Sequence, residues 1–278
     1  AYNLKQVAGY PMMVYESCWV PPMSKQSEGP FLIAAYGSLS GVDSLYWFCT
    51  SEEAFASRMG KWQIADPMQL GSFPAASWMF RTGLIKRGEV AVHEERSLGS
   101  IWKREHPIIS EDMGFDPNRD AAFGAKEAAV TAVDPKAFLV GPVHVVYDGD
   151  PAKSTTVDLS KYIQGDRITS ITGELVMDAK VGVCTLKAPG AQGATGSLKA
   201  AGSIDCGTVT IRSGNDYASV LCVALDGKPL DTSKKVFVQV TTRARPHGWK
   251  HQAGTFPVTN GKAKGEFTGF KITSVGGA

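Results

Sequence analysis

The sequence lacks a long hydrophobic run and lacks an excess of charge of either sign. No uninterrupted apolar stretch in its 278 residues approaches the about 18–20 residues that a membrane-spanning helix needs. Its 29 Lys and Arg residues nearly balance 27 Asp and Glu, and the net charge of +2 gives little long-range attraction for nucleic acid or anionic lipid. We therefore expect neither nucleic acid nor a membrane among its partners.

Cysteine is scarce, and paired-cysteine motifs are absent. Five cysteines are scattered along the chain, none spaced as C-x-x-C: Cys18, Cys49, Cys184, Cys206 and Cys222. This spacing gives no support for a zinc site or a thioredoxin-like motif, and we predict no metal and no cofactor. Buried free thiols are the simplest interpretation. A Cys206–Cys222 or a Cys184–Cys206 bridge stays open, because spacing alone does not decide pairing.

The two ends of the chain carry little information about its destination. The chain begins at Ala1, with no Met, no basic segment and no apolar leader, and it ends just after a strand-like run. We interpret one or both ends as truncated. If the missing N-terminal part was a signal segment, a secreted or periplasmic location follows; otherwise the compartment is unknown.

Composition and patterning change near residue 110. Five of the six tryptophans and six of the eight methionines precede it. In this first part, apolar runs at 10–15 and 44–48 predict buried parallel strands, and apolar periodicity predicts helices over 28–39 and about 74–86. The order strand, helix, strand, helix is typical of βαβ units.

The second part reads as all-β. No helical pattern longer than about two turns follows residue 130. Strand-like runs occur at 143–147, 209–211, 218–225 and 236–242, and turn signals occur at Asp148-Gly149, Asp226-Gly227 and Asn260-Gly261. These patterns predict an antiparallel β-sandwich.

The predicted fold class is therefore α/β plus all-β. Residues 1–105 form the α/β segment, residues 106–134 a linker and residues 135–278 the sandwich. Two βα units cannot close a barrel, so the first segment has open sheet edges. We expect either preceding sequence or a second copy of the chain to cover them.

Glu16 is the strongest candidate for a chemical role. It stands at the C-terminal end of an apolar strand, where the loops of parallel α/β folds converge on a ligand. A carboxylate at that end can act as a nucleophile or a general base, although a structural ion pair is an equally good interpretation. Trp47 occupies the corresponding end of the next strand, where an indole suits the apolar face of a sugar ring or simply fills a core.

Three segments carry a resemblance to a known family. Together they resemble the last two βα units of a retaining (β/α)8-barrel glycoside hydrolase. The three segments are YESCWVPP at 15–22, SEGPFLIAAY at 27–36 and GVDSLYWF at 41–48. Residues 73–81 and 92–96 resemble the final barrel helix and the start of a trailing β-domain. The resemblance covers roughly residues 10–105, and it implies a fold that is a partial (β/α)8-type barrel followed by a β-sandwich.

The resemblance also implies roles for individual residues. Glu16 becomes the nucleophile that attacks the anomeric carbon, while Trp19, Tyr46 and Trp47 line the sugar subsite. The second carboxyl group of such enzymes lies on an earlier strand, which would precede Ala1. Retaining chemistry places the two carboxyls about 5–5.5 Å apart. The nearest candidates in sequence are Glu52, Glu53, Glu94 and Glu95.

Two interpretations of other classes remain open. The β-domain alone can be a carbohydrate-binding or subunit-contact module that works through its aromatic residues, namely Tyr147, Tyr162, Tyr217 and Trp249. Alternatively, the chain is an esterase-type hydrolase on an unusual architecture. The sugar, the linkage and exo or endo action are not encoded in any pattern that we find.

Other motifs are weaker. Alternation along a strand brings His93 and Glu95 to one face, which suits a metal or acid–base role less well than a surface ion pair. A calcium site is a weaker prediction, for which the side-chain oxygens come from Asp148, Asp150 and Asp158.

Two further segments have simple structural interpretations. Residues 190–196 are glycine-rich and most simply form a loop or bulge. The basic, aromatic-bearing segment 243–251 predicts a protruding hairpin or a contact with an anionic sugar.

Overall fold

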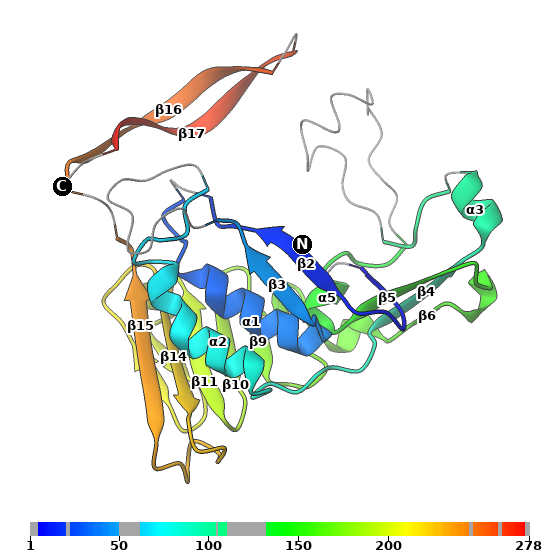
Figure 1. Cartoon of the computed structure of the whole chain (residues 1–278), viewed down its shortest axis with the longest axis horizontal. Coiled ribbons are helices and arrows are strands. Elements are labelled where there is room, and N and C mark those ends of the chain that lie inside the picture. Colours follow the sequence, from blue (N-terminus) through cyan, green and yellow to red (C-terminus); the bar gives the residue numbers. More distant parts are fainter. Residues whose placement is uncertain are drawn as a thin grey trace.

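The computed structural model describes residues 5–20, 23–49, 62–103, 105–109, 132–244, 247–260 and 263–275. Within these ranges the chain is a mixed α/β protein made mostly of strands (Figure 1), and the described strands form no closed barrel. The barrel part of the expected fold is therefore not visible, whereas the mixture of α/β and β structure is confirmed.

A seven-stranded antiparallel sheet is the largest element of the fold. Its strand order is β15-β14-β11-β10-β9-β8-β7. The strands span Ile163–Gln164 (β7), Arg167–Thr169 (β8), Leu175–Asp178 (β9), Val183–Lys187 (β10), Ala191–Gly196 (β11), Ala218–Ala224 (β14) and Val236–Thr242 (β15). The strands predicted at 218–225 and 236–242 are thus confirmed, and they pair with each other.

The prediction of a loop at 190–196 is wrong. Residues 191–196 form β11, a central strand in which all six residues are buried. Small residues are required here because a Cβ at Gly193 would lie 2.2 Å from the carbonyl oxygen of Val220, and Gly196 adopts a φ of +129°. The glycines that suggested a loop instead allow neighbouring backbone to approach closely.

Two helices cover one face of this sheet. Helix α1 spans Glu28–Ser40 and α2 spans Phe73–Arg81, preceded by the 3-10 turn η1 at Leu70–Ser72. Figure 1 shows both helices lying across β9, β10, β11 and β14. The helix predicted over 28–39 is confirmed, and it ends at Gly41 with a left-handed φ of 71°. Helix α2 stops five residues earlier than the predicted end at 86.

The helices and the antiparallel sheet share one hydrophobic core. Phe31 and Leu39 from α1 and Met79 from α2 are packed with Leu186 and Leu221 of the sheet, and all five are at most 1% exposed. This face of the sheet is therefore covered by helices and not by a second sheet, which differs from the expected sandwich. The apolar surface of α1 extends round most of the helix, so it needs cover on more than one side.

Strands β2 (Met13–Ser17) and β3 (Ser44–Trp47) form a separate two-stranded parallel sheet, connected through α1. The predicted parallel pairing is confirmed. The prediction that these strands are buried is wrong, since Met13 is 55% and Tyr15 is 77% exposed. Among the described residues, no further strand pairs with β2 or β3.

A four-stranded sheet holds the remaining parallel strands. Its order is β1-β5-β4-β6, with β1 at Gln6–Val7, β5 at Val143–Tyr147, β4 at Val92–Arg96 and β6 at Thr155–Thr156. Strands β1, β5 and β4 are parallel neighbours. The strand predicted at 143–147 exists, but it belongs to this sheet and not to a sandwich. The short helices α3 (Leu98–Trp102) and α5 (Ala137–Val140) lie between β4 and β5 in the sequence.

Two hairpins complete the chain. Strands β12 (Ser203–Asp205) and β13 (Thr210–Arg212) pair beside the short helix α6 (Leu198–Ala201), and their Ile204 and Ile211 pack in one cluster with Leu198. Strands β16 (Trp249–Asn260) and β17 (Ala263–Val275) form a long hairpin that stands apart from the sheets (Figure 1). The turn predicted at Asn260-Gly261 falls between these two strands, whereas only residues 249–251 of the segment 243–251 belong to the hairpin.

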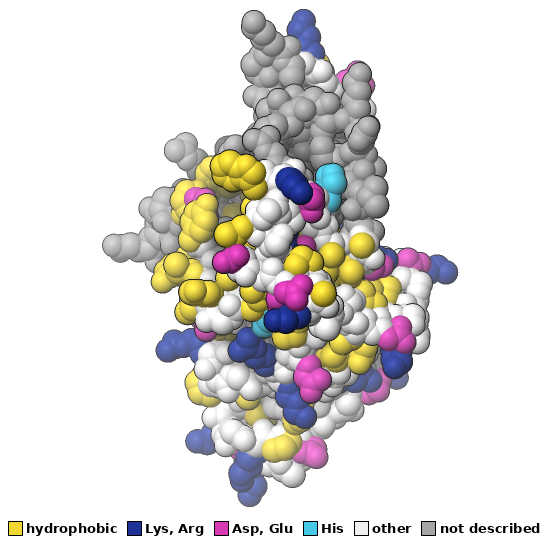
Figure 2. Space-filling view, turned by 90° about the vertical axis from the view of Figure 1, so that its right-hand side faces the viewer, with side chains coloured by type: hydrophobic (Ala, Val, Ile, Leu, Met, Phe, Trp, Pro, Cys, Tyr) yellow, Lys and Arg dark blue, Asp and Glu magenta, His cyan; other side chains and the backbone are white. Residues whose placement is uncertain are grey.

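Figure 2 shows Asp, Glu, Lys and Arg side chains interspersed over one face of the molecule, with hydrophobic side chains between them. This mixture agrees with the small net charge of +2. Among the described residues, no helix combines the length and apolar character that a bilayer crossing requires.

Candidate functional site

The C-terminal ends of β2 and β3 meet side by side. Ser17 pairs with Trp47 in the parallel register, and the amide of Phe48 donates a hydrogen bond of 2.8 Å to the carbonyl of Ser17. Glu16 directly precedes this pair. The structure therefore brings Glu16, Tyr46 and Trp47 to the same end of the same sheet, as the sequence pattern predicts for consecutive βα units.

The register of β2 against β3 is irregular at Glu16. Val14 pairs with Leu45 and Ser17 with Trp47, so two residues of β2, Tyr15 and Glu16, lie opposite the single residue Tyr46. Such a bulge turns side chains that would otherwise alternate between faces, and bulges are common beside active sites. No pattern in the sequence predicts this bulge.

The two faces of this small sheet differ in their surroundings. On one face, Leu45 and Trp47 line a cavity against α1 and α2. Away from it, Tyr15 is 77% and Tyr46 is 58% exposed, and Glu16 is exposed as well. Glu16 is therefore exposed at the end of β2, next to two exposed phenol rings.

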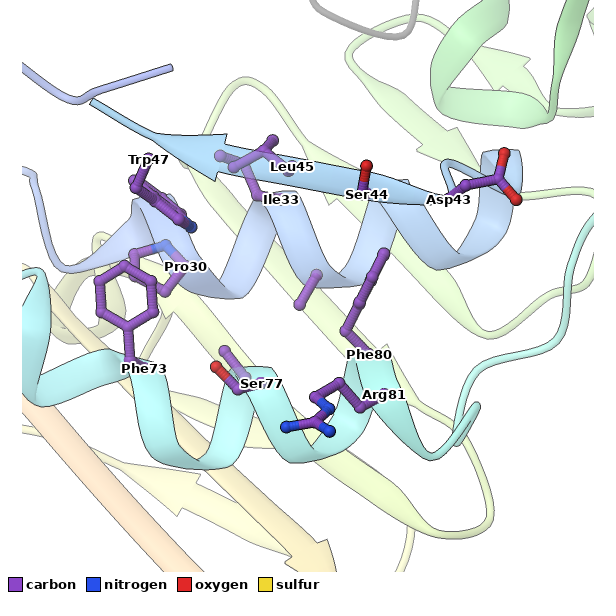
Figure 3. A pocket seen from close by; sticks show the side chains of 12 residues that line it. Pro30, Ile33, Asp43, Ser44, Leu45, Trp47, Phe73, Ser77, Phe80 and Arg81 are labelled. Carbon is purple, nitrogen blue, oxygen red and sulfur yellow. The ribbon is translucent and has the colours of Figure 1, made fainter. Parts of the chain in front are cut away.

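The cavity on the helical side has a volume of about 280 Å³ and lies between β3, α1 and α2 (Figure 3). Its walls are mostly apolar. At one end the Trp47 ring meets Phe73 edge-on, with 4.9 Å between ring centroids, and at the other end lie Asp43 and Arg81. Trp47 is thus used in packing against α2, which corresponds to the core role that was weighed beside sugar binding.

Trp19, the other indole expected at the sugar subsite, is held by the protein on several sides. Its ring nitrogen donates to Glu28 Oε1 at 3.0 Å. Its carbonyl oxygen accepts from the side-chain amides of Gln26 at 2.6 Å and Gln69 at 3.1 Å. A Cβ on Gly29 would lie 3.0 Å from the indole ring, so the absence of a side chain there makes room for it. These contacts make Trp19 an anchor for the chain that leaves β2.

Glu28 connects this anchor to the antiparallel sheet. One carboxylate oxygen accepts from Trp19, and the other accepts from the hydroxyl of Tyr217, the residue before β14. Burial raises the pKa of Glu28 above its usual value, and the hydrogen bond from Trp19 and the charge of Lys25 partly oppose this shift. In the sequence Glu28 looks like an ordinary acidic residue in the first turn of a helix, and its role was not foreseen.

The aromatic residues expected to serve a binding module are not grouped. Tyr217 is 5% exposed and its hydroxyl is bonded to Glu28, so it has no ring face to offer a sugar. Tyr147 is 52% exposed but lies on β5, in the four-stranded sheet. The side chain of Trp249 lies outside the described residues.

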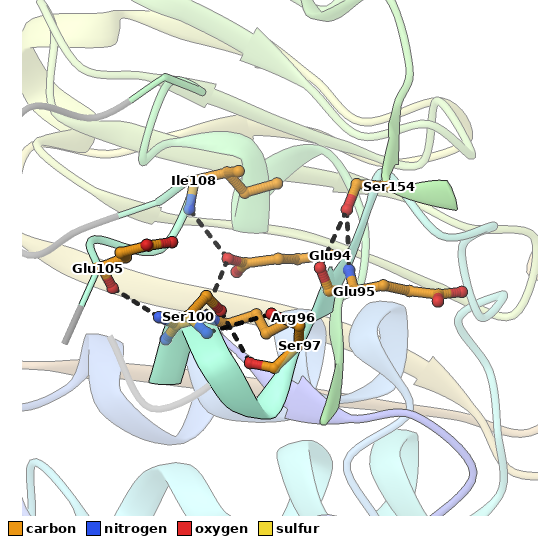
Figure 4. A network of polar contacts seen from close by, with 8 residues as sticks. All are labelled: Glu94, Glu95, Arg96, Ser97, Ser100, Glu105, Ile108 and Ser154. Atoms are coloured by element: carbon orange, nitrogen blue, oxygen red, sulfur yellow. Dashed lines mark hydrogen bonds and ion pairs between the residues drawn. The ribbon is translucent and has the colours of Figure 1, made fainter. Parts of the chain in front are cut away.

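Glu94 and Glu95, two of the candidates for a second carboxyl group, are engaged in the four-stranded sheet (Figure 4). Glu94 is 5% exposed, accepts from the amide of Ile108 at 3.0 Å, and lies 3.8 Å from Arg96. Glu95 accepts from the amide of Asp150 at 2.8 Å. These bonds fasten the segment 105–109 and the turn after β5 to β4. Glu52 and Glu53, the other two candidates, lie outside the described residues.

The structure contains the contact between His93 and Glu95 that alternation along the strand predicts. His93 Nε2 lies 3.3 Å from Glu95 Oε1, as expected for an ion pair on one face of a strand. The hydrogen bond from Asp150, followed by the contact with His93, lowers the pKa of Glu95. Burial lowers the pKa of His144, which pairs with His93 across the strands.

The structure gives the other polar motifs structural roles. Asp150 caps the 3-10 turn η2 (Pro151–Lys153) through the amide of Ala152, and Asp158 caps η3 (Leu159–Lys161) through the amide of Ser160. Among the described residues, no group of three His, Cys, Asp or Glu side chains is placed to hold a metal ion.

All five cysteines are free thiols, so neither bridge left open by the sequence is present. Three of them are buried and two, Cys18 and Cys49, are half-buried. Burial raises the pKa of the Cys184 thiol to about 12, which keeps it protonated at neutral pH.

No protein-family model, no curated protein and no solved structure matches this chain. We therefore infer the function of the chain from the geometry at the ends of β2 and β3.

Proposed function

We propose that this chain is part of a retaining glycoside hydrolase in which Glu16 is the nucleophile. One observation carries the proposal: Glu16 is exposed at the C-terminal end of one of two adjacent parallel strands that are joined by a helix. In (β/α) folds, catalytic side chains come from these strand ends. The segment β2-α1-β3-α2 would then be the last two βα units of a barrel.

The surroundings of Glu16 support a sugar as the ligand. Tyr15 precedes it and Tyr46 lies opposite it on β3, and their large rings are 77% and 58% exposed, which suits contact with the apolar face of a pyranose. Trp19 and Trp47 support the site from behind by packing, with ring centroids 6.1 Å apart. We therefore assign sugar contact to Tyr46 and a positioning role to the two indoles.

The chemistry follows from one carboxylate and a second acid. Glu16 attacks the anomeric carbon as the bond to the leaving oxygen breaks, and an ester between sugar and protein forms. A carboxylic acid about 5–5.5 Å from Glu16 protonates the leaving oxygen and then activates the water that cleaves the ester. We assign that second role to none of the described residues.

The proposal also requires cover for the open sheet. A nucleophile works in a site from which most water is excluded, whereas Glu16 is exposed. Further strands of a barrel, or a second copy of the chain, would pair with the free edges of β2 and β3. The apolar side chains on that face, Met13 at 55% exposed among them, support this part of the proposal.

A mechanism-based label tests the role of Glu16 without needing the second acid. A panel of 2-deoxy-2-fluoroglycosides with a dinitrophenolate leaving group would be incubated with the chain, because such a leaving group departs without protonation. We expect a stable glycosyl ester on Glu16, located by peptide mass spectrometry.

The control is a pair of matched substitutions. Glu16→Gln should keep the fold and lose the label, whereas Glu89→Gln, at an exposed position remote from β2 in the chain, should keep both. Labelling of a different carboxylate, or no labelling by any sugar of the panel, would contradict the assignment.

A further inference from the structure

The two half-buried cysteines follow the paired strand ends. Cys18 comes directly after β2, and Cys49 comes two residues after β3. Because Ser17 and Trp47 are register partners, the chain segments that carry the two thiols leave the sheet side by side.

The backbone oxygen of Trp62 brings the two cysteines together. Cys18 Sγ donates to this oxygen at 3.6 Å, and the amide of Cys49 donates to the same oxygen at 2.9 Å. The amide of Ile64 in turn donates to the carbonyl of Cys49 at 3.2 Å. The Cys18 thiol is therefore next to the backbone of Cys49, although 31 positions separate them in the sequence.

The other three thiols lie in different surroundings. Cys184 is 2% exposed with its sulfur 3.8 Å from the hydroxyl of Tyr36, and Cys206 is fully buried with its sulfur 3.3 Å from the carbonyl of Gly193. Cys222 is 5% exposed on the central strand β14. Reagents in solution reach such positions slowly, whereas Cys18 and Cys49 are partly accessible.

We propose that Cys18 and Cys49 form a disulfide bond that ties the C-terminal end of β2 to that of β3. This inference does not depend on the glycosidase proposal. The bond would close a loop that contains the whole of α1, and it would fix the spacing of the strand ends that carry Glu16 and Trp47.

The oxidant for this step is a small-molecule disulfide such as oxidised glutathione. The thiolate of one cysteine attacks a sulfur of the reagent, forms a mixed disulfide and releases one glutathione thiolate. The second cysteine thiolate attacks the protein sulfur of the mixed disulfide and releases the other. The protein loses two protons and two electrons in total, and the reagent becomes two molecules of the free thiol.

The surroundings of Cys18 set the conditions for exchange. Burial raises its pKa to about 11, a contact with Gln69 acts against this, and the neighbouring Asp66 and Cys49 add to the increase. The thiolate fraction is therefore small at neutral pH, and the exchange should accelerate as the pH rises.

The test is disulfide mapping on the whole chain. The reduced protein is equilibrated with oxidised glutathione at mildly alkaline pH, free thiols are blocked with N-ethylmaleimide, and peptides are identified by mass spectrometry. We expect one linked pair, Cys18 with Cys49, and three blocked cysteines. Blocking of both Cys18 and Cys49, glutathione left on either one, or a Cys206–Cys222 link in their place would overturn the proposal.

Thermal unfolding provides a second measurement on the unmutated protein. The oxidised chain should melt about 5 °C or more above the reduced chain, because the bond restricts the unfolded state. The difference should vanish in Cys18→Ser and Cys49→Ser variants, and it should persist in a Cys222→Ser variant. An equal melting temperature for oxidised and reduced wild-type protein would count against the bond.

Discussion

At the scale of single residues, the structure depends on a few buried polar contacts that join distant parts of the chain. Glu28 accepts hydrogen bonds from Trp19 in the N-terminal part and from Tyr217 beside β14. Gln26 and Gln69, both fully buried, hold the carbonyl of Trp19 from two sides. These contacts and packing hold Trp19 and Trp47 in place, the two indoles that the resemblance assigns to a sugar subsite.

Removal of the Glu28 carboxylate should weaken the fold. In Glu28→Ala the indole nitrogen of Trp19 and the hydroxyl of Tyr217 lose their acceptor in a part-buried site, so we expect the free energy of unfolding to fall by about 2–3 kcal/mol. Glu28→Gln keeps an acceptor for Trp19 and should cost less. Urea unfolding followed by fluorescence measures both, and equal stability of the alanine variant and wild type would contradict the role.

The Glu28 carboxylate should also make the stability of the fold depend on pH. Its pKa in the folded protein is raised above 4.5, so the folded state resists losing this proton. The contribution of Glu28 to stability is therefore present in full below 4.5 and is lost as the pH rises through the folded pKa. The stability of Glu28→Gln relative to wild type should increase over that rise, and a pH-independent difference would show that burial does not act on this group.

At the scale of elements, sequence patterns predicted α1, α2 and several strands but missed most strands of the seven-stranded sheet, including its central strand β11. The 3.6-residue periodicity and the glycine after it identified α1, and runs of branched residues identified β14 and β15. Strand β11 was missed because its residues are small, as its close packing requires. The bulge at Tyr15 and Glu16 depends on pairing with β3, so the sequence of β2 alone does not predict it.

A single methyl group in β11 should be costly. In Gly193→Ala the new Cβ would meet the carbonyl oxygen of Val220 at 2.2 Å, and neighbouring strands cannot separate without loss of hydrogen bonds. We expect a loss of about 3 kcal/mol in the free energy of unfolding.

Gly214→Ala is the matched control, because a Cβ there would meet no atom within 4 Å. It should change stability by no more than about 0.5 kcal/mol. Thermal melts of the two variants would distinguish them, and similar melting temperatures would refute the packing argument.

At the scale of the whole molecule, the two parts separated by sequence composition share a core. The shift near residue 110 predicts a change from α/β to β-rich patterning, yet β5 and β6 from the second part join β1 and β4 in one sheet. It gave no sign that α1 and α2 cover the antiparallel sheet, because helix-to-sheet packing is set by surfaces that only the folded chain brings together. The sequence pattern therefore does not predict whether a second sheet or a layer of helices covers the seven-stranded sheet.

Residues 135–278 alone should consequently fail to fold as the intact chain does. Without α1 and α2, the sheet would expose Leu186, Leu221 and their neighbours, which are at most 1% exposed in the whole protein. We expect this segment to bind a hydrophobic dye and to unfold without a sharp transition, whereas the intact chain should melt cooperatively. A soluble segment with a cooperative melt would show that the β-rich part is independent.

Helix α1 lies between two sheets, with Ile33 lining the cavity behind β3 and Phe31 in the core of the antiparallel sheet. Because α1 contacts β11 and β14 as well, it connects these strands physically to the strand ends beside Glu16. Chimeras that exchange the N-terminal part for that of another protein should therefore succeed only when the seven-stranded sheet is exchanged with it.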